Sequence, residues 1–166
     1  LLIYATGFDG VTGPYDRIDI KGKEGRCLKE EWTTFPRTLF GMQVDGYPNM
    51  LMILGPHTAR GNIPRNIEEV VEWQTDLISF MMENEFDRVE PDSAAVDDWI
   101  NTVSKASEGL LSSKIASWQT GVNRNVEGRS APRVLGYNGG AVRYRKIIDS
   151  VATREYQEFL FSKIGK

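Results

Sequence analysis

Tyr47-Pro48-Asn49-Met50-Leu51-Met52-Ile53-Leu54-Gly55-Pro56 is the stretch that decides the fold. Its apolar run at 49–54 predicts a buried strand, and the Gly-Pro pair that follows would stop it. After a loop comes Gly61-Asn62-Ile63-Pro64, where a helix is expected to begin near Pro64 or Asn66. Proline suits the first helical turn, and Asn66 with Glu69 has the spacing of a capping box. Strand, tight loop and helix in this order indicate an α/β fold.

The expected helix runs to about Glu85 and carries one apolar face, formed by Ile67, Val70, Val71, Trp73, Leu77, Ile78 and Met81. Its N-terminus would present free N–H groups and the positive end of the helix dipole to an anionic or electron-rich ligand, such as the pyrimidine edge of a flavin. A plain strand-to-helix turn without any ligand fits the same residues, so both interpretations stay open here.

The chain starts with a second apolar run, Leu1-Leu2-Ile3-Tyr4-Ala5-Thr6-Gly7-Phe8. We expect a buried strand whose Thr6-Gly7 end lets the backbone approach a flat ligand or its phosphates closely, because glycine has no side chain. The buried edge of any α/β sheet is the alternative. A glycine-rich turn at 9–14 and a small hairpin at 17–28 should follow. Since the sequence lacks an initiator Met and begins inside a strand, we expect a piece of a larger protein.

The second half of the chain is expected to hold helices and loops. One helix should begin at Pro91-Asp92, residues 112–138 are rich in loop signals, and a last helix should cover 142–161. Trp73 and Trp99 fall on apolar helix faces and are predicted to be core residues, and the aromatic stretch at 32–40 is predicted to be packing. No repeats or linkers are visible, so the chain should form one compact α/β piece.

Composition narrows the functional classes. The 166 residues carry a net charge of -3, with 40% hydrophobic and 26% charged residues, and no basic stripe, which argues against nucleic acid or an anionic membrane as a partner. No apolar stretch is long enough to cross a bilayer. Cys27 is the only cysteine and His57 the only histidine, so an internal disulfide and a cysteine-rich metal site are excluded, and little material remains for a histidine-based triad or a clustered histidine metal site. A cytoplasmic protein that relies on a cofactor fits these limits.

The order of the motifs resembles the C-terminal third of Baeyer–Villiger monooxygenases, which are flavin enzymes. The resemblance covers nearly the whole chain and rests on six segments: Ala5-Thr6-Gly7-Phe8, Pro48-Asn49-Met50, Gly55-Pro56, Asn62-Ile63-Pro64, Ser117-Trp118-Gln119-Thr120-Gly121-Val122-Asn123, and Tyr137-Asn138-Gly139-Gly140 with Tyr144. It implies a fold that is part of a two-dinucleotide-binding-domain flavoprotein. Residues 1–85 would then be the C-terminal part of the FAD-binding domain, and 86–166 a helical and loop-rich segment packed on it.

The resemblance also implies a function and a set of site residues. The activity would be oxidation of a ketone to an ester or lactone with FAD, NADPH and O2. Six residues would bind cofactor: Thr6, Gly7, Asn62, Ile63, Trp118 and Asn123, the last two on a loop that closes over NADP and substrate. Four would face the substrate: His57, Arg60, Gly61 and Val134. No catalytic residue and no metal ligand is expected. Trp118 as core, His57 as an ordinary loop residue and Arg60 as a solvated arginine are the alternatives.

Some parts of such an enzyme are not in this sequence. No Gly-x-Gly-x-x-Gly follows a strand, although the family uses two such loops for FAD and NADP, and these lie upstream. We therefore expect the chain to need an upstream FAD- and NADP-binding portion of the same protein as a partner. Two other functions remain: an N- or S-oxygenating flavin monooxygenase, and a non-catalytic domain derived from such an enzyme.

Overall fold

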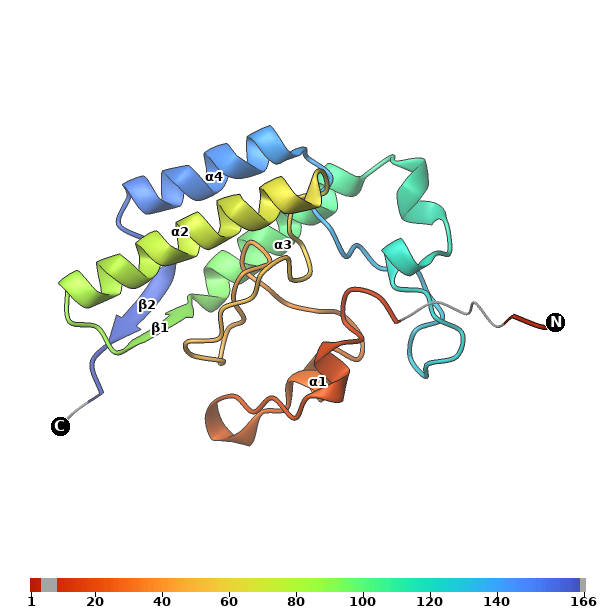
Figure 1. The fold of residues 1–166 in the computed structure, drawn as a ribbon, viewed down its shortest axis with the longest axis horizontal. Helices are drawn as coiled ribbons and strands as arrows, with labels where there is room; N and C mark the ends of the chain where they lie inside the picture. The colour runs from red at the N-terminus through yellow and green to blue at the C-terminus, as the bar shows by residue number, and fades with distance from the viewer. Residues whose placement is uncertain (4–8, 165–166) are drawn as a thin grey trace.

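The computed structural model describes residues 1–3 and 9–164. Most of the predicted N-terminal strand, including Thr6 and Gly7, therefore lies outside the described residues. Four α-helices and two strands follow in the order α1 (Leu28–Glu31), α2 (Ile63–Glu83), β1 (Arg88–Pro91), α3 (Ser93–Ser107), α4 (Ala141–Thr153) and β2 (Phe159–Ser162). Two short 3-10 turns precede α1, η1 (Tyr15–Arg17) and η2 (Lys23–Gly25), and two more lie between α3 and α4, η3 (Leu111–Lys114) and η4 (Trp118–Thr120). In Figure 1, α2 and α4 lie side by side above α3, with β1 and β2 at one end.

The last helix is shorter than predicted. It ends at Thr153 instead of Phe161, and β2 pairs antiparallel with β1 in the register Arg88 to Ser162 and Pro91 to Phe159. Glu155 and Tyr156 both have φ of 56°, a left-handed conformation that a helix cannot contain, so they turn the chain back toward β1. Neither strand was predicted, because each has only four residues.

The predicted strand at 49–54 is wrong. Asn49 and Leu54, at its two ends, have φ of 59° and 56°, and these left-handed residues turn the chain instead of extending it. The backbone between them is held by single hydrogen bonds from unrelated segments. Met52 N–H donates to Met42 O at 2.8 Å, and the Gln74 side chain donates to Met52 O at 2.8 Å. The apolar run thus reflects packing of Met52 in the core and not a place in a sheet.

The long helix α2 begins one turn earlier than the predicted cap. Asn62, not Asn66, is the N-cap, and its side chain accepts from Arg65 N–H at 3.1 Å. Pro64 does lie in the first turn, as predicted. Asn66 is instead buried and donates to Ala59 O at 3.0 Å, which ties the helix to the loop before it. The second helix prediction is confirmed, because Asp92 caps α3 through Ala94 N–H at 2.7 Å.

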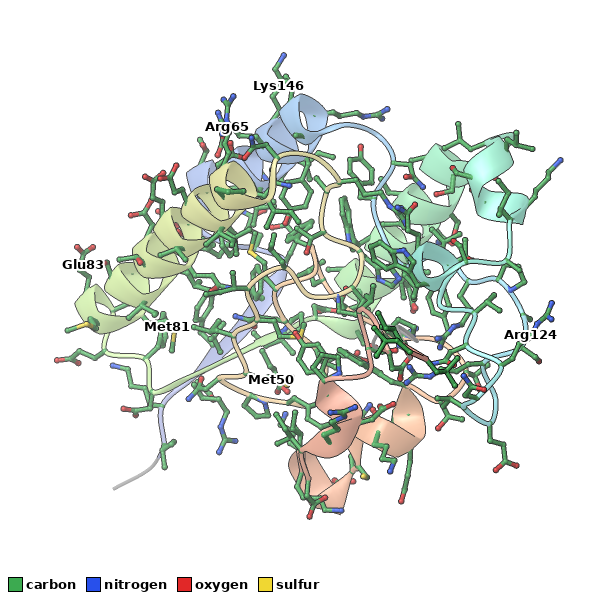
Figure 2. The ribbon with its side chains drawn as sticks, turned by 45° about the vertical axis from the view of Figure 1, so that its right-hand side comes forward. Met50, Arg65, Met81, Glu83, Arg124 and Lys146 are labelled. Carbon is green, nitrogen blue, oxygen red and sulfur yellow. The ribbon has the colours of Figure 1, made fainter. Side chains whose placement is uncertain are left out.

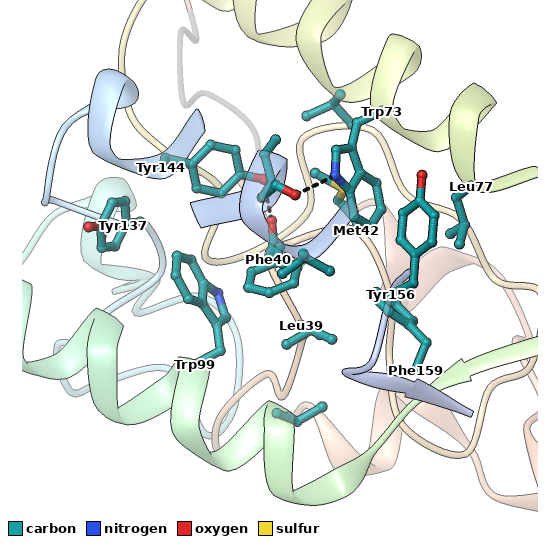
Figure 3. Close-up of a cluster of buried hydrophobic side chains, with 14 of the residues drawn as sticks. Leu39, Phe40, Met42, Trp73, Leu77, Trp99, Tyr137, Tyr144, Tyr156 and Phe159 are labelled. Carbon is teal, nitrogen blue, oxygen red and sulfur yellow. Dashed lines mark hydrogen bonds between the residues drawn. The ribbon is translucent and has the colours of Figure 1, made fainter. Parts of the chain in front are cut away.

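The main hydrophobic core lies between α2, α3 and α4 (Figure 3). Trp73 and Trp99 are both buried in it, as predicted. Two polar contacts fix its aromatic groups: Trp73 Nε1 donates to Ile148 O at 2.8 Å, and the Tyr144 hydroxyl donates to Phe40 O at 2.6 Å. Burial raises the pKa of the Tyr144 phenol, so it stays protonated as a donor. Both sides of the predicted division at residue 85 contribute to this one cluster.

A smaller cluster of Leu28, Trp32, Val44, Tyr47 and Met52 lies beneath the N-terminal segment. The predicted hairpin is reduced to one antiparallel bridge between Lys21 and Cys27. Lys23 forms an ion pair with Glu90, which fastens this part to β1. Trp32 and Phe40 are buried, so the prediction of the aromatic stretch as packing is confirmed for both.

Helix α2 has a second apolar face that the rest of the described chain does not cover. Trp73, Leu77 and Val70 face the core. Turned by roughly a quarter of the helix circumference from them lie five exposed apolar residues: Ile63, Ile67, Val71, Ile78 and Met82. Charged residues fill the remaining side; Arg65 and Glu83 mark its two ends in Figure 2. No helix in the described part of the chain is long and apolar enough to cross a membrane.

Candidate functional site

A recess of about 430 Å³ opens where α2 begins. Its walls come from residues 54–66, from the η4 turn and from residues 135–136, with Val11 at its edge. This volume is within the range of small-molecule sites. Three of the predicted substrate and cofactor residues line it together with Trp118: Arg60, Gly61 and Ile63.

The recess exists because two distant segments pair in parallel. Ala59 and Tyr137 form an isolated bridge. Tyr137 N–H donates to Thr58 O at 2.9 Å, Arg60 N–H donates to Tyr137 O at 3.3 Å, and His57 N–H donates to Leu135 O at 3.1 Å. This short pairing places the loop before α2 beside the segment that follows the 117–133 loop. The recess therefore has two walls that come from distant parts of the chain.

His57 lies behind the wall and not in the recess. Its side chain is fully buried and stacks on Phe35 with ring centroids 5.2 Å apart. Nε2 lies 3.1 Å from Val134 O and Nδ1 lies 3.1 Å from the Thr38 hydroxyl. Because a carbonyl only accepts, Nε2 carries the proton. Burial lowers the pKa of His57 from 6.5 to about 4, so the ring is neutral near pH 7 and links two segments.

Arg60 connects the recess to the η4 turn. Its guanidinium donates to Gln119 Oε1 at 3.0 Å and to Gln119 O at 2.9 Å. The arginine lies against Gly136, where a Cβ atom would come within 2.6 Å of Arg60 Nε. Any larger residue at 136 would therefore displace the guanidinium. Arg60 is exposed yet engaged, which differs from a freely solvated loop arginine.

The N-terminus of α2 offers fewer free donors than the sequence predicts. Pro64 has no N–H, Asn62 Oδ1 accepts from Arg65 N–H, and Asn62 O accepts from Asn66 N–H. Among the described residues, no acceptor is paired with the backbone N–H of Gly61, Asn62 or Ile63, and Gly61 and Ile63 line the recess. A ligand here would meet these N–H groups together with the positive end of a 21-residue helix.

Trp118 is the one indole on the surface among the described residues. It is 62% exposed, whereas Trp32, Trp73 and Trp99 are each at most 5% exposed. Its ring lies against Gly10, where a Cβ atom would come within 3.1 Å of Cε3. The Ser117 and Thr120 side chains close a capping box around the turn that carries it. Trp118 is thus held at the rim of the recess and is not core.

Besides His57, three predicted site residues do not line the recess: Asn62, Asn123 and Val134. Asn123 donates through Nδ2 to Asp9 Oδ1 at 3.2 Å and accepts from Asn125 N–H at 3.1 Å. Val134 is half-buried, packs against the core and borders a very small neighbouring hollow that Arg60 also touches. Asn62 acts as the helix cap. The structure therefore brings together four of the eight described site residues and places the others around them.

Sequence reasoning did not find the ion pairs beside the site. Arg129 is almost fully buried and contacts Asp9 and Asp16. About 120 residues of sequence separate the partners, so no local pattern could link them. Gln119 and Thr58 were also missed as lining residues. In the described part of the chain, no group of three or more metal-ligating side chains converges.

The fold and the recess define a class of protein. A crystal structure of cyclohexanone monooxygenase from Rhodococcus sp. Phi1 bound to NADP+ matches 98% of this chain and 30% of its own chain, with a TM-score of 0.91 and 34% identity. This neighbour confirms the predicted fold class, part of an α/β flavoprotein with two dinucleotide-binding domains. No model of a protein family matches the chain.

Within this class, the chain is related over nearly its whole length to Baeyer–Villiger and similar flavin monooxygenases. Cyclohexanone 1,2-monooxygenase of an Acinetobacter species is 38% identical over 159 residues, and a phenazine N-monooxygenase of Lysobacter antibioticus is 37% identical over 160 residues. Each match covers 96% of this chain. The chain spans 29% of the length of either relative, so it corresponds to less than a third of such a protein.

Proposed function

We propose that this chain acts within an FAD- and NADPH-dependent monooxygenase that converts ketones to esters or lactones with O2. The observation that supports this most is the similarity itself. The chain is 38% identical to one cyclohexanone monooxygenase, and its structure matches a second one with a TM-score of 0.91. The chain would contribute a wall of the active site, and the upstream portion of the same protein would contribute the phosphate-binding loops.

The residues of the recess fit a flavin or nicotinamide ring. The lining combines apolar groups of Leu54, Ile63 and Leu135 with one arginine and the unpaired N–H groups of Gly61 and Ile63. A flat, weakly polar ring matches such a surface better than a multiply charged group would. When bound, the flavin supplies the redox chemistry that activates O2, and the nicotinamide supplies the electrons.

The chain's own residues would orient these groups. The Ile63 N–H and the dipole of α2 would favour a partial negative charge at the recess. Trp118 would cover the recess from its rim and limit the access of water, with Asn123 on the same loop. Arg60 and Gly61 would face the substrate. Val134 and His57 would set the shape of this wall from behind it, and Asn62 would act through the helix cap.

Several other predictions become part of this proposal. Thr6 and Gly7 would lie beside the FAD, and the upstream FAD- and NADP-binding portion would complete the site. Residues 1–85 would be the C-terminal part of the FAD-binding domain, and 86–166 a helical and loop-rich segment packed on it. A small ketone and O2 would be the substrates, and the reducing cytoplasm would be the compartment, as the single cysteine favours.

N-oxygenation is the second candidate, and one specific observation supports it. The phenazine N-monooxygenase matches this chain as well as the cyclohexanone enzyme does. The recess lining described above is compatible with either substrate, because it contains no group that would distinguish a carbonyl from an aromatic nitrogen.

Product analysis tests the proposal. The purified protein that carries this chain, loaded with FAD, would be given NADPH and either cyclohexanone or phenazine. Lactone formation coupled to NADPH consumption is the expected result. An N-oxide from phenazine without any lactone would replace the first candidate with the second. If the protein binds no FAD and consumes no NADPH even with the upstream portion present, the third candidate, a non-catalytic domain derived from such an enzyme, replaces both.

A further inference from the structure

Arg129 forms the buried centre of a charge cluster beside the recess. Its side chain is 4% exposed, and each of the two carboxylates around it is 20% exposed. Nη1 contacts Asp9 Oδ2 at 2.5 Å, and Nη2 contacts Asp16. An arginine that reaches two carboxylates with separate nitrogens is fixed in position and orientation, because the guanidinium is planar.

The dipeptide Asp9-Gly10 receives three contacts from the same loop. Asp9 Oδ2 binds Arg129, Asp9 Oδ1 accepts from Asn123 Nδ2 at 3.2 Å, and the Trp118 ring lies on Gly10. The loop at 117–133 thus touches the N-terminal segment at three points that share two adjacent residues. Asp9 also follows directly after the segment that we propose to border the flavin.

Internal hydrogen bonds make this loop one unit. Arg133 N–H donates to Thr120 O at 2.8 Å, and Asn123 N–H donates to Arg129 O at 2.8 Å. The first bond closes the base of the loop next to Trp118, and the second joins Asn123 to the anchoring arginine. A shift of Arg129 is therefore passed to Asn123 and to the turn that holds Trp118. Figure 2 shows the unit at the edge of the molecule, with Arg124 pointing outward from it.

The cluster is close to electrically balanced. Arg133 lies near enough that its pKa is lowered by burial first and by the charge of Arg129 second, while Asp9 and Asp16 act in the opposite direction. Two carboxylates therefore face two guanidinium groups. Removal of one member leaves a partly buried charge without a partner, and this lowers stability more than replacing the whole pair by apolar residues would.

We infer that Arg129 is a positioning residue, which through Asp9 holds Trp118 at the rim of the recess. The effect of Arg129 on the reaction rests on the proposed function. The effect of Arg129 on the position of Trp118 concerns this chain alone. The competing interpretation is that the ion pairs merely stabilise residues 9–16 and 127–131 locally. The two interpretations differ in whether Trp118 responds when the pair is removed.

Trp118 itself provides the measurement. Because the other three indoles are buried, acrylamide should quench the emission of Trp118 selectively in the purified chain. Hydrogen–deuterium exchange of peptides from 117–126 reports the same loop independently. Four variants are compared: Arg129→Met, Asp9→Asn, their combination, and Asp19→Asn as control. Asp19 is an exposed carboxylate that pairs with Lys21, so the control removes the same charge elsewhere.

Arg129→Met and Asp9→Asn should each raise exchange at 117–126 by about tenfold or more, because charge-assisted hydrogen bonds are the strong ones. Both should increase quenching of Trp118, with exchange in α2, α3 and α4 unchanged. The double variant should show no faster exchange at 117–126 than either single variant, since each single substitution already removes the contact between Arg129 and Asp9. Asp19→Asn should change nothing.

Faster exchange confined to 9–16 and 127–131, with unchanged quenching, would overturn the inference. So would additive effects in the double variant. If Arg129→Met does not fold, the isosteric Asp9→Asn and the conservative Arg129→Lys decide between the two interpretations. Arg129→Lys should have an intermediate effect, because an ammonium group cannot bind two carboxylates as the planar guanidinium does.

In the FAD-loaded protein, Asp9→Asn should raise the KM for NADPH more than it lowers FAD content. A changed loop without that kinetic effect would count against the proposed function and not against the positioning.

Discussion

Asn49 pairs with Val89 as a neighbouring strand would. Its N–H donates to Val89 O at 2.9 Å, and Val89 N–H donates in return to Asn49 Oδ1 at 2.9 Å. Asn49 Nδ2 also donates to Asp87 O at 2.9 Å. One side chain and one peptide group thus satisfy the free edge of β1, at a residue with φ of 59° where asparagine is tolerated better than most residues.

Asn49→Ala should destabilise the chain by about 1–3 kcal/mol, because two side-chain hydrogen bonds are lost and alanine is unfavourable at positive φ. Asn49→Gly should cost less, since glycine keeps the backbone conformation while losing the same bonds. Urea unfolding at pH 7 measures both. Asn101→Ala, at an exposed position of α3, is the matched control and should change stability by less than about 0.5 kcal/mol. Equal losses for Asn49→Ala and the control would show that the pairing contributes nothing.

His57 should make stability depend on pH. Its pKa is about 4 in the folded chain and near 6.5 when unfolded, so below pH 6.5 the unfolded chain binds a proton that the folded chain does not. The free energy of unfolding should therefore be constant above about pH 7 and fall as the pH drops toward 4. Between pH 7 and pH 5 the loss from this group should be about 2 kcal/mol.

His57→Gln provides the test, because no other histidine can titrate in this range. The variant should be less stable at pH 7, since the bridge between Thr38 and Val134 is altered, but its stability should vary little between pH 7 and pH 5. A wild-type slope in the variant would assign the pH dependence to carboxylates instead.

The two apolar faces of α2 should respond differently to substitution. Leu77 is fully buried, and Leu77→Ala should cost about 2–5 kcal/mol. Ile67→Gln and Val71→Gln lie on the uncovered face and should change stability by less than about 0.5 kcal/mol while reducing binding of a hydrophobic dye. Thermal unfolding and dye fluorescence of the isolated chain measure the two effects. Strong destabilisation by Ile67→Gln would mean that this face is covered.

Trp118→Ala in the FAD-loaded protein should lower NADPH-coupled oxygenation by roughly three- to tenfold, the size of one aromatic contact, while FAD retention changes little. The reason is its position at the rim, where the ring is exposed and supports no core residue. Steady-state kinetics and the flavin absorbance of the same sample provide both values. Equal loss of FAD and of activity would show that the residue acts in folding.

The three longer helices could be predicted from the sequence because their signals are local, although the cap of α2 and the end of α4 were misplaced. Asp92 caps α3 next to the apolar pattern that it starts, and Trp73 and Trp99 fall on faces that the pattern marks as buried. The strand prediction at 49–54 failed because an apolar run does not reveal whether a partner strand exists. Asn49 and Leu54 show that the chain turns at both ends; asparagine tolerates the left-handed conformation, but leucine gives no local sign of it.

The site was predictable only in part for a similar reason. Arg60, Gly61 and Ile63 are close in sequence, so one motif located all three. Trp118 was found through its motif, but its contact with Gly10 could not be predicted, because the two residues are far apart in the sequence. His57 was predicted to face the substrate and is instead enclosed by Phe35, Thr38 and Val134, which come from two other segments.

The bond between Arg60 and Gln119 has a consequence for ligands that carry negative charge. The guanidinium that would attract such a ligand is already occupied by two neutral oxygens of the η4 turn. An anion entering the recess competes with Gln119 for the same donors, and a charged acceptor is the stronger competitor. Its arrival would remove one of the contacts that hold the turn that carries Trp118, so binding of the anion would be coupled to loosening of the rim.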